Sequence, residues 1–215
     1  MSHTVLFSGG RDARGHLDTT ETTDKHTVDS CVIACPPHPQ HGGHYTDKRL
    51  RAVSDQLSPE IDCLRIAYGS WDHGHGEYAD VTNAVEWARS RYDKYGLFGY
   101  SFGAALAIGV ATASTCIDCV SALAPPQSID DGSVIETTTA IHRTDTPTQL
   151  IYGTQDEIVT VDPIVEMLQQ HTSRDECDIR SFPTDHSFQS SIDEVSIAVG
   201  AFVDSVITSE TKCQQ

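Results

Sequence analysis

Short runs rich in Val, Ile, Leu and Cys alternate with longer segments of helical periodicity along most of this 215-residue chain. Continuous apolar runs of this kind predict buried parallel strands, and the segments between them predict helices that cover both faces of the sheet. The predicted fold class is therefore α/β, with a mostly parallel central sheet of about seven or eight strands. The predicted parallel strands are Cys31–Cys35, Asp62–Ala67, Tyr95–Tyr100, Cys119–Leu123, Thr148–Tyr152 and Asp178–Phe182.

The remaining segments fit the same architecture. Thr4–Phe7 and Gly15–Thr20 predict an antiparallel pair that opens the sheet, and the connection Pro125–Pro147 predicts a short loop or small flap rather than a large lid. The length suits one hydrophobic core, so we expect a single domain over residues 1–215 with a frayed tail at Thr208–Gln215. Helical spacing predicts helices over Asp47–Leu57, Tyr78–Arg91, Phe102–Ala113, Pro163–His171 and Ile192–Ile207.

Charge and the absence of sorting signals narrow the function. The chain carries 31 acidic and 14 basic residues, a formal charge of −17, so we expect no nucleic-acid partner. Val5–Phe7 is shorter than the roughly 7 to 15 apolar residues of a secretory signal, and Ala104–Ala111 is shorter than the roughly 18 of a membrane span. The seven cysteines favour free thiols in a reducing compartment. We therefore expect a soluble cytoplasmic protein, a monomer or homodimer, with no membrane partner.

The run Gly99-Tyr100-Ser101-Phe102-Gly103 stands between a predicted strand and a predicted helix. In this context a G-x-S-x-G sequence is typical of a nucleophile elbow, a tight turn that exposes a serine at the edge of the sheet. Gly99 and Gly103 are expected there because a side chain at either position would collide with neighbouring backbone. Ser101 is therefore the candidate nucleophile.

A serine hydroxyl needs a base that is oriented by a third group, and in this fold the three follow in the chain order serine, acid, histidine. Asp156 comes shortly after the predicted strand Thr148–Tyr152, so it stands at the carboxyl edge of the sheet where Ser101 also emerges. Asp156 is the candidate acid. Glu157 and Asp162 are close enough in sequence to be rivals.

His186 follows the predicted strand Asp178–Phe182 by a short turn that contains Pro183, which again places it at the carboxyl edge. It is the candidate base. His171 and His142 fit this role less well, because they lie at a predicted helix end and in the long connection. The arrangement predicts acyl transfer through a serine nucleophile.

Acyl transfer also needs backbone N–H groups that stabilise the negative oxygen of the tetrahedral intermediate. The first is expected from Phe102, at the start of the helix after the serine. The second is expected from the loop after the strand Cys31–Cys35. Pro39 has no N–H, so Gln40 is the first candidate in that loop and His41 the next.

Five runs in this order resemble the small lidless α/β-hydrolases related to dienelactone hydrolase, in particular a prokaryotic subgroup with an HPHP-like loop that ends in Gly-Gly. The resemblance extends from about Gly15 to Val206 and implies an ester or thioester hydrolase with these triad positions. Dienelactone hydrolases proper carry a cysteine nucleophile where this chain has Ser101, and Pro36 or Pro37 replaces the first histidine of the loop. The five runs are Cys35–Gly43, Gly74–Glu77, Gly99–Gly103, Gly153–Val159 and Asp185–Phe188.

A metal site competes for the same loops. Imidazoles and carboxylates at this density are ligands that zinc and nickel accept. Polar side chains also collect naturally beside an oxyanion hole, so we expect no metal and no cofactor. The residues concerned are His38, His41, His44, Asp72, His73, His75 and Glu77.

These features predict a serine hydrolase that cleaves carboxylic esters of small to medium size, because no lid domain is recognisable over the site. The expected partner is a small-molecule acyl ester. Two alternatives stay open: a thioesterase or peptidase with the same triad, and a non-catalytic binding protein of the same fold.

The acidic composition predicts a dependence on salt. Aspartate outnumbers glutamate by 21 to 10 and only four residues are lysine, a composition that resembles the proteins of salt-in halophiles. Like-charge repulsion destabilises a compact state in dilute buffer, and dense salt screens it. We therefore expect the melting temperature to be low in dilute buffer and to rise in molar KCl. A melting temperature that is the same in both contradicts a halophilic origin.

Overall fold

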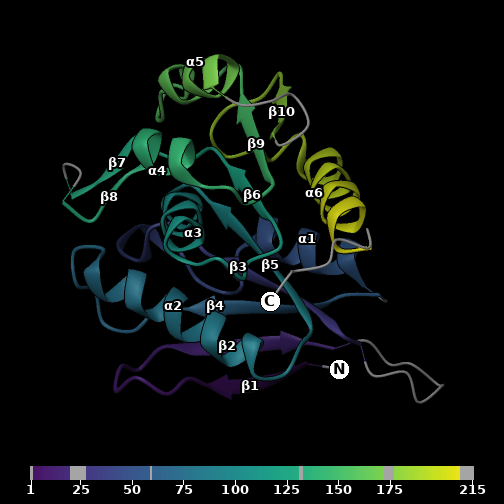
Figure 1. Ribbon diagram of the computed structural model, residues 1–215. Helices are drawn as coiled ribbons and strands as arrows, with labels where there is room; N and C mark the ends of the chain where they lie inside the picture. The colour runs from purple at the N-terminus through teal and green to yellow at the C-terminus, as the bar shows by residue number, and fades with distance from the viewer. Residues whose placement is uncertain (1, 20–27, 59, 131–132, 172–176, 209–215) are drawn as a thin grey trace.

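The computed structural model of the chain describes residues 2–19, 28–58, 60–130, 133–171 and 177–208. Its main strands are β1 (Ser2–Leu6), β2 (Arg14–Asp18), β3 (Ser30–Cys35), β4 (Asp62–Ala67), β5 (Lys94–Tyr100), β6 (Val120–Leu123), β9 (Thr148–Gly153) and β10 (Cys177–Phe182). They form one sheet in the order β1-β2-β4-β3-β5-β6-β9-β10 (Figure 1). The strands from β4 to β10 in this order are parallel, and β1 and β2 add an antiparallel edge. The α/β class and the mostly parallel sheet are confirmed.

Helices cover both faces of this sheet. They are α1 (Lys48–Leu57), α2 (His75–Arg89), α3 (Phe102–Ala113), α4 (Thr137–Arg143), α5 (Asp162–His171) and α6 (Ile192–Ile207). Because side chains alternate along a strand, Val32 and Ala34 of β3 enter the core under α1 and α6, whereas Cys31 and Ile33 enter the core under α2 and α3. Burial on both faces explains why the central strands are continuously apolar.

The order of the strands creates a crevice at one edge of the sheet. After β3 the chain moves outward to β4, and it then returns to the other side of β3 as β5. The connections from β3 and β5 therefore diverge at their carboxyl ends, which is where open α/β sheets bind ligands. Ser101 directly follows β5 at this point.

The connection between β6 and β9 differs from the predicted loop. It holds the short strands β7 (Ser128–Ile129) and β8 (Ile135–Glu136), followed by helix α4 (Figure 1). Threonine is a weak helix former, so three consecutive threonines at the start of α4 gave no helical signal. The helix forms because the Glu136 carboxylate accepts a bond from the amide of Thr139 and because Ile141 is fully buried. No large lid covers the site among the described residues, as expected.

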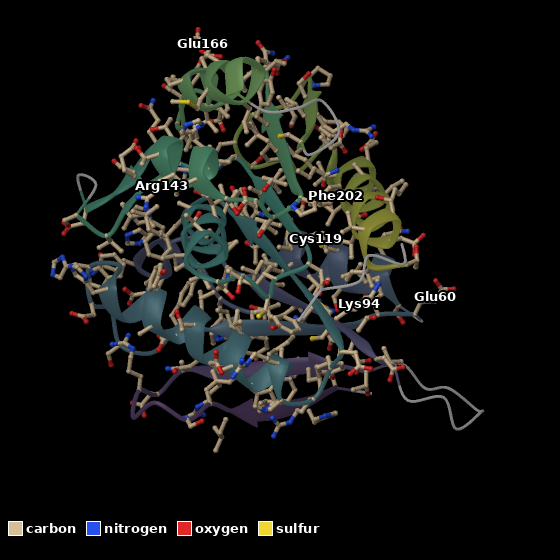
Figure 2. The ribbon with its side chains drawn as sticks, in the orientation of Figure 1. Glu60, Lys94, Cys119, Arg143, Glu166 and Phe202 are labelled. Carbon is tan, nitrogen blue, oxygen red and sulfur yellow. The ribbon has the colours of Figure 1, made fainter. Side chains whose placement is uncertain are left out.

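Most of the described cysteines are packing residues, whereas Cys116 is exposed. In the described part of the chain all of them are free thiols, and Cys31, Cys35, Cys63 and Cys119 are buried. Cys119 lies inside the molecule, directly before β6 rather than within it (Figure 2). Burial raises the pKa of the Cys63 thiol to about 12, which keeps it protonated and unreactive.

The described residues bear on two predictions, the absence of a membrane span and the frayed tail. No helix within those ranges is long and apolar enough to cross a bilayer. The predicted frayed tail lies outside them from residue 209 onward.

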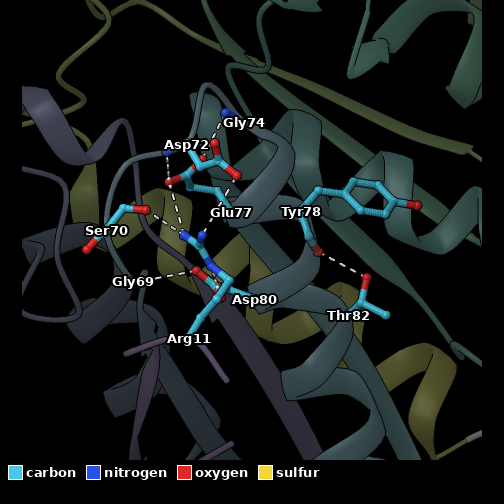
Figure 3. A network of polar contacts seen from close by, with 9 residues as sticks. All are labelled: Arg11, Gly69, Ser70, Asp72, Gly74, Glu77, Tyr78, Asp80 and Thr82. Carbon is cyan, nitrogen blue, oxygen red and sulfur yellow. Dashed lines mark hydrogen bonds and ion pairs between the residues drawn. The ribbon is translucent and has the colours of Figure 1, made fainter. Parts of the chain in front are cut away.

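Arg11, in the turn between β1 and β2, joins this turn to the start of α2 (Figure 3). Its Nε donates to Asp80 Oδ1 at 2.8 Å, and its Nη2 lies 3.6 Å from Glu77 Oε1. Both carboxylates are completely buried, and Arg11 itself is 23% exposed. Two buried negative charges therefore depend on one guanidinium.

The same carboxylates hold the loop between β4 and α2. Glu77 accepts bonds from the amides of Asp72 and Gly74 at 3.0 and 2.8 Å, and Asp80 accepts one from the amide of Gly69 at 2.9 Å. Arg11 Nη2 adds a bond to the carbonyl oxygen of Ser70 at 2.6 Å. Polar contacts therefore hold the loop along its length (Figure 3).

Replacing Arg11 with methionine keeps the length of the side chain and removes its charge. We expect the free energy of unfolding to fall by at least about 2 kcal/mol, because two buried carboxylates lose their cation. Arg89→Met is the matched control, since Arg89 pairs with Glu86 on the exposed surface of α2, and it should cost less than about 0.5 kcal/mol. Denaturant unfolding of both variants measures the difference. Equal losses of unfolding free energy in both variants would show that Arg11 contributes no more to stability than a surface arginine.

Candidate active site

Ser101 occupies a strained turn between β5 and α3. Its φ and ψ are 53° and −118°, a conformation that costs about 1 to 3 kcal/mol for a residue with a side chain. Two backbone bonds hold the turn: the Ser101 amide donates to Leu123 O at 2.7 Å, and the Ala104 amide donates to Ser101 O at 2.9 Å. Such strain at a serine between a strand and a helix is typical of a nucleophile elbow.

The two glycines of the pentapeptide permit a close approach of backbone segments. A Cβ on Gly99 would lie 2.3 Å from Gly103 O, and a Cβ on Gly103 would lie 2.3 Å from Cys35 O. Both distances are far shorter than real carbon contacts, and the obstructing atoms belong to the backbone. A side chain on Gly99 would separate β5 from the start of α3, and one on Gly103 would separate the end of β3 from the same helix.

The structure brings the three predicted triad residues together. Ser101 Oγ lies 3.1 Å from His186 Nε2, and His186 Nδ1 lies 2.7 Å from Asp156 Oδ2. An ionised carboxylate only accepts hydrogen bonds, so Nδ1 carries the hydrogen and Nε2 presents its lone pair to the serine hydroxyl. This is the arrangement that a general base requires.

Asp156 is fixed by its surroundings. Its Oδ1 accepts bonds from the amides of Ile158 and Val159 at 2.9 and 3.0 Å, and its side chain is 2% exposed. The sequence rivals Glu157 and Asp162 are both exposed. A buried carboxylate that accepts two amide bonds and faces an imidazole is held in one orientation.

The acid and the base meet because their strands end level with each other. Gly153, the last residue of β9, pairs with Phe182, the last residue of β10. The two following turns are then tied together, since the Thr154 amide donates to Phe182 O at 2.8 Å and the Gln155 amide donates to Thr184 O at 3.1 Å. Asp156 and His186 therefore emerge side by side at the carboxyl edge.

Tyr100 and Arg49 brace the turn that carries His186. Tyr100 Oη donates to His186 O at 2.9 Å, and Arg49 Nη1 donates to Ser187 O at 2.8 Å. The guanidinium carbon of Arg49 lies 4.1 Å from the centroid of the Tyr100 ring, and Asp47 Oδ1 accepts from Arg49 Nε at 2.8 Å. Burial raises the pKa of Tyr100 to about 12, so its hydroxyl remains a donor at neutral pH.

Sequence reasoning missed this brace. Tyr100 lies inside the pentapeptide, but its position there says nothing about the His186 carbonyl. In the sequence, Arg49 is simply one basic residue on a predicted helix. Its partner Ser187 is 138 positions away. No local pattern encodes such a contact.

The backbone amides that were predicted to stabilise the oxyanion differ in whether their N–H groups already have an acceptor. The Phe102 N–H, at the first position of α3, has no acceptor within its helix. The Gln40 amide donates to His38 Nδ1 at 3.2 Å and the His41 amide donates to His38 O at 3.0 Å, both within the 3₁₀ turn Pro39–His41. His38 has the one amide N–H between Cys35 and Gln40, because the other three residues are prolines.

Ser101 opens into a cavity of about 320 Å³. The loops after β3 and β4 form one part of its wall, and the segment that includes β7 forms another. The lining residues are His38, His41, Trp71, His73, Ser101, Phe102, Pro126, Ser128, Ile129 and Asp130.

The histidine-rich loops meet at this cavity, but their side chains do not converge on one point. The His38 and His41 rings stack with centroids 4.7 Å apart, and the Glu77 carboxylate is occupied by backbone amides. Among the residues that the structure describes, no three His, Cys, Asp or Glu side chains are arranged to hold a metal ion.

A model of the dienelactone hydrolase family matches residues 64–205. No curated protein sequence matches the chain. The family match spans both β5, with the serine that follows it, and the turns that carry Asp156 and His186.

Solved structures share the fold. A lidless α/β serine hydrolase from Xanthomonas campestris is 24% identical, with a TM-score of 0.78 over 98% of this chain and 97% of that chain. The protein Est1E from Butyrivibrio proteoclasticus is 16% identical, with a TM-score of 0.79 over 97% of this chain and 99% of that chain. The esterase Pf2001 from Pyrococcus furiosus is also 16% identical, with a TM-score of 0.78 over 96% of this chain and 92% of that chain.

Tyr100→Phe removes the hydroxyl that holds His186 O and keeps the ring beside Arg49. We expect the rate at which a fluorophosphonate probe labels Ser101 to fall about tenfold, because a displacement of about 1 Å near reacting groups costs up to about a hundredfold. Mass spectrometry of the Ser101 peptide measures the rate. Tyr95→Phe, at the opposite end of β5, is the matched control. Equal labelling of both variants and of the wild type argues against the brace.

Proposed function

The chain belongs to the dienelactone hydrolase family, and on this basis we propose that it is a serine hydrolase that cleaves carboxylic esters of small to medium size. The single observation that carries the proposal is the continuous hydrogen-bonded line from Asp156 through His186 to Ser101, at 2.7 and 3.1 Å. A nucleophile, a base and an orienting acid in this geometry suit acyl transfer and need no cofactor.

In the first half of the reaction, Ser101 Oγ attacks the ester carbonyl carbon while His186 Nε2 takes the hydroxyl proton. The carbonyl oxygen becomes negative in the tetrahedral intermediate. When this intermediate collapses, the carbon–oxygen bond to the alcohol breaks and His186 returns its proton to the leaving alkoxide. Asp156 stabilises the positively charged imidazole between these two transfers.

In the second half, water attacks the acyl-enzyme. His186 takes a proton from the water, and the carbonyl oxygen again becomes negative. The bond between the acyl carbon and Ser101 Oγ then breaks, and His186 returns the proton to the serine. The products are one alcohol and one carboxylic acid, and the enzyme regains its starting state.

We assign the stabilisation of the negative oxygen to two amides. Phe102 N–H stands at the start of α3, where the helix dipole also favours negative charge. His38 N–H is the amide of the β3 loop that the neighbouring turn does not use, since Gln40 and His41 both donate to atoms of His38. Removing one such donor typically costs about a hundredfold or more in rate.

The cavity limits the size of the substrate. Its volume of about 320 Å³ is near the lower end of ligand pockets, which span roughly 300 to 1,000 Å³. The β7–β8 hairpin and α4 are too small to form a closed lid over a long acyl chain. These features support short or medium water-soluble esters rather than emulsified lipids.

The test compares the wild type with Ser101→Ala on p-nitrophenyl acetate and butyrate in molar KCl. We expect turnover by the wild type and a loss of at least about a thousandfold in the variant, as removal of a nucleophile causes. Circular dichroism of both proteins provides the folding control. Matched thioesters and peptide amides then rank the alternative activities.

Two outcomes count against the proposal. Equal activity of both proteins excludes Ser101 as the nucleophile. A folded wild type that neither turns over esters nor reacts with a fluorophosphonate probe favours a binding protein of the same fold.

A further inference from the structure

One part of the cavity wall beside Ser101 consists of aromatic rings. The His38 ring lies 4.7 Å from His41 and 4.4 Å from Trp71, measured between ring centroids. Trp71 in turn lies 5.6 Å from His73. All four rings line the cavity, so they form a continuous series of contacts along it.

This ring wall begins next to the reacting atoms. The Phe102 ring lies 5.0 Å from His38 and 5.8 Å from Trp71, and Phe102 directly follows the nucleophile. The Phe102 amide is also one of the two groups assigned to the carbonyl oxygen. A group attached a few bonds from the ester carbonyl would therefore contact these rings.

The wall is held in place before a substrate enters. Trp71 lies between Ser70, whose carbonyl accepts from Arg11, and Asp72, whose amide donates to the buried Glu77. Figure 3 shows this network at the base of the loop. A preformed site loses little conformational freedom on binding, so ring contacts contribute to affinity nearly in full.

The charged groups among the described lining residues also bear on the choice of substrate. Among the described residues that line it, none is lysine or arginine, and Asp130 adds a carboxylate. Burial, and then the neighbouring His41, lower the pKa of His38, so that ring is neutral at pH 7. A carboxylate on the substrate would meet negative charge without a partner.

From this wall and this charge we infer that the enzyme selects esters that carry a flat, uncharged aromatic ring close to the carbonyl. The inference rests on the esterase function proposed above and specifies its substrate class. Aromatic pairs gain from offset and edge contacts beyond the area that they bury. The cavity has room for one such ring with a short linker.

Two esters of equal reactivity test the preference for a flat ring. Methyl 3-phenylpropanoate and methyl 3-cyclohexylpropanoate differ only in the ring, which stands two carbons from the carbonyl in both. The cyclohexyl group is the more apolar, so a merely hydrophobic pocket favours it. We expect kcat/KM to be about three- to tenfold higher for the phenyl ester, the range that ring contacts supply.

A second pair tests the charge. Methyl 3-(4-carbamoylphenyl)propanoate and methyl 3-(4-carboxyphenyl)propanoate have nearly the same shape and differ by one negative charge at pH 7. At one fixed salt concentration we expect a higher kcat/KM for the amide. A higher value for the carboxylate overturns the assignment of an uncharged substrate.

Variants at the two tryptophans of the chain connect the preference to the wall. Trp71→Leu should bring the phenyl-to-cyclohexyl ratio to one or below, because the largest ring of the wall is lost. Trp87→Leu is the matched control, since Trp87 lies on α2, packs against Tyr92 and is not among the residues that line the cavity. This control should keep the wild-type ratio.

The outcomes separate this inference from the proposed function. A wild-type ratio of one or below, or an equal ratio in Trp71→Leu and the wild type, overturns the ring preference. Turnover of p-nitrophenyl acetate and labelling of Ser101 by the fluorophosphonate probe would still leave the esterase function standing. If the folded wild type is not labelled and turns over none of these esters, both proposals fail.

Discussion

The close approach of β3 to the start of α3, with no side chain between them, is the contact on which the site depends. Gly103 lies directly against the carbonyl groups of Cys35 and Pro36. This contact sets the β3 loop beside Ser101, so that His38 and the nucleophile line one cavity. A wider separation would move the β3 loop, with the His38 amide and the ring wall, away from Ser101. Backbone packing of this kind is rigid, which suits a site that must hold geometry to within about half an ångström.

Three arginines of this acidic chain hold loops and turns of the fold in place. Arg11 joins two buried carboxylates at the start of α2, and Arg49 joins Asp47 to the turn after His186. Arg65, which is buried, binds Asp18 and the carbonyl oxygen of Tyr45. Each guanidinium therefore neutralises local charge and also donates to backbone oxygens, a combination that its planar fork of donors permits. These contacts place positive charge beside carboxylates in a chain of net charge −17.

Local patterns predict the sheet and the triad positions because each is recorded within a few residues. Apolar runs mark the buried strands, and the pentapeptide marks the turn at Ser101. The braces are different, since Arg11 and Asp80 are 69 positions apart and become neighbours only after the sheet has formed. Helix α4 escaped prediction for a related reason: its threonines favour other conformations, and burial of Ile141 decides the outcome. Long-range contacts and tertiary burial lie beyond what a window of sequence records.

The position of β10 in the chain determines when Ser101 and His186 come together. This strand is the last of the sheet in the chain and stands at its edge, and the turn after it carries His186. Ser101 leaves the ribosome well before that turn, because synthesis proceeds from the N-terminus. A growing chain therefore carries a serine without its base, and the hydroxyl remains an ordinary alcohol until the final strand docks on β9. Under the proposed mechanism, Ser101 therefore becomes a nucleophile only when the sheet is complete.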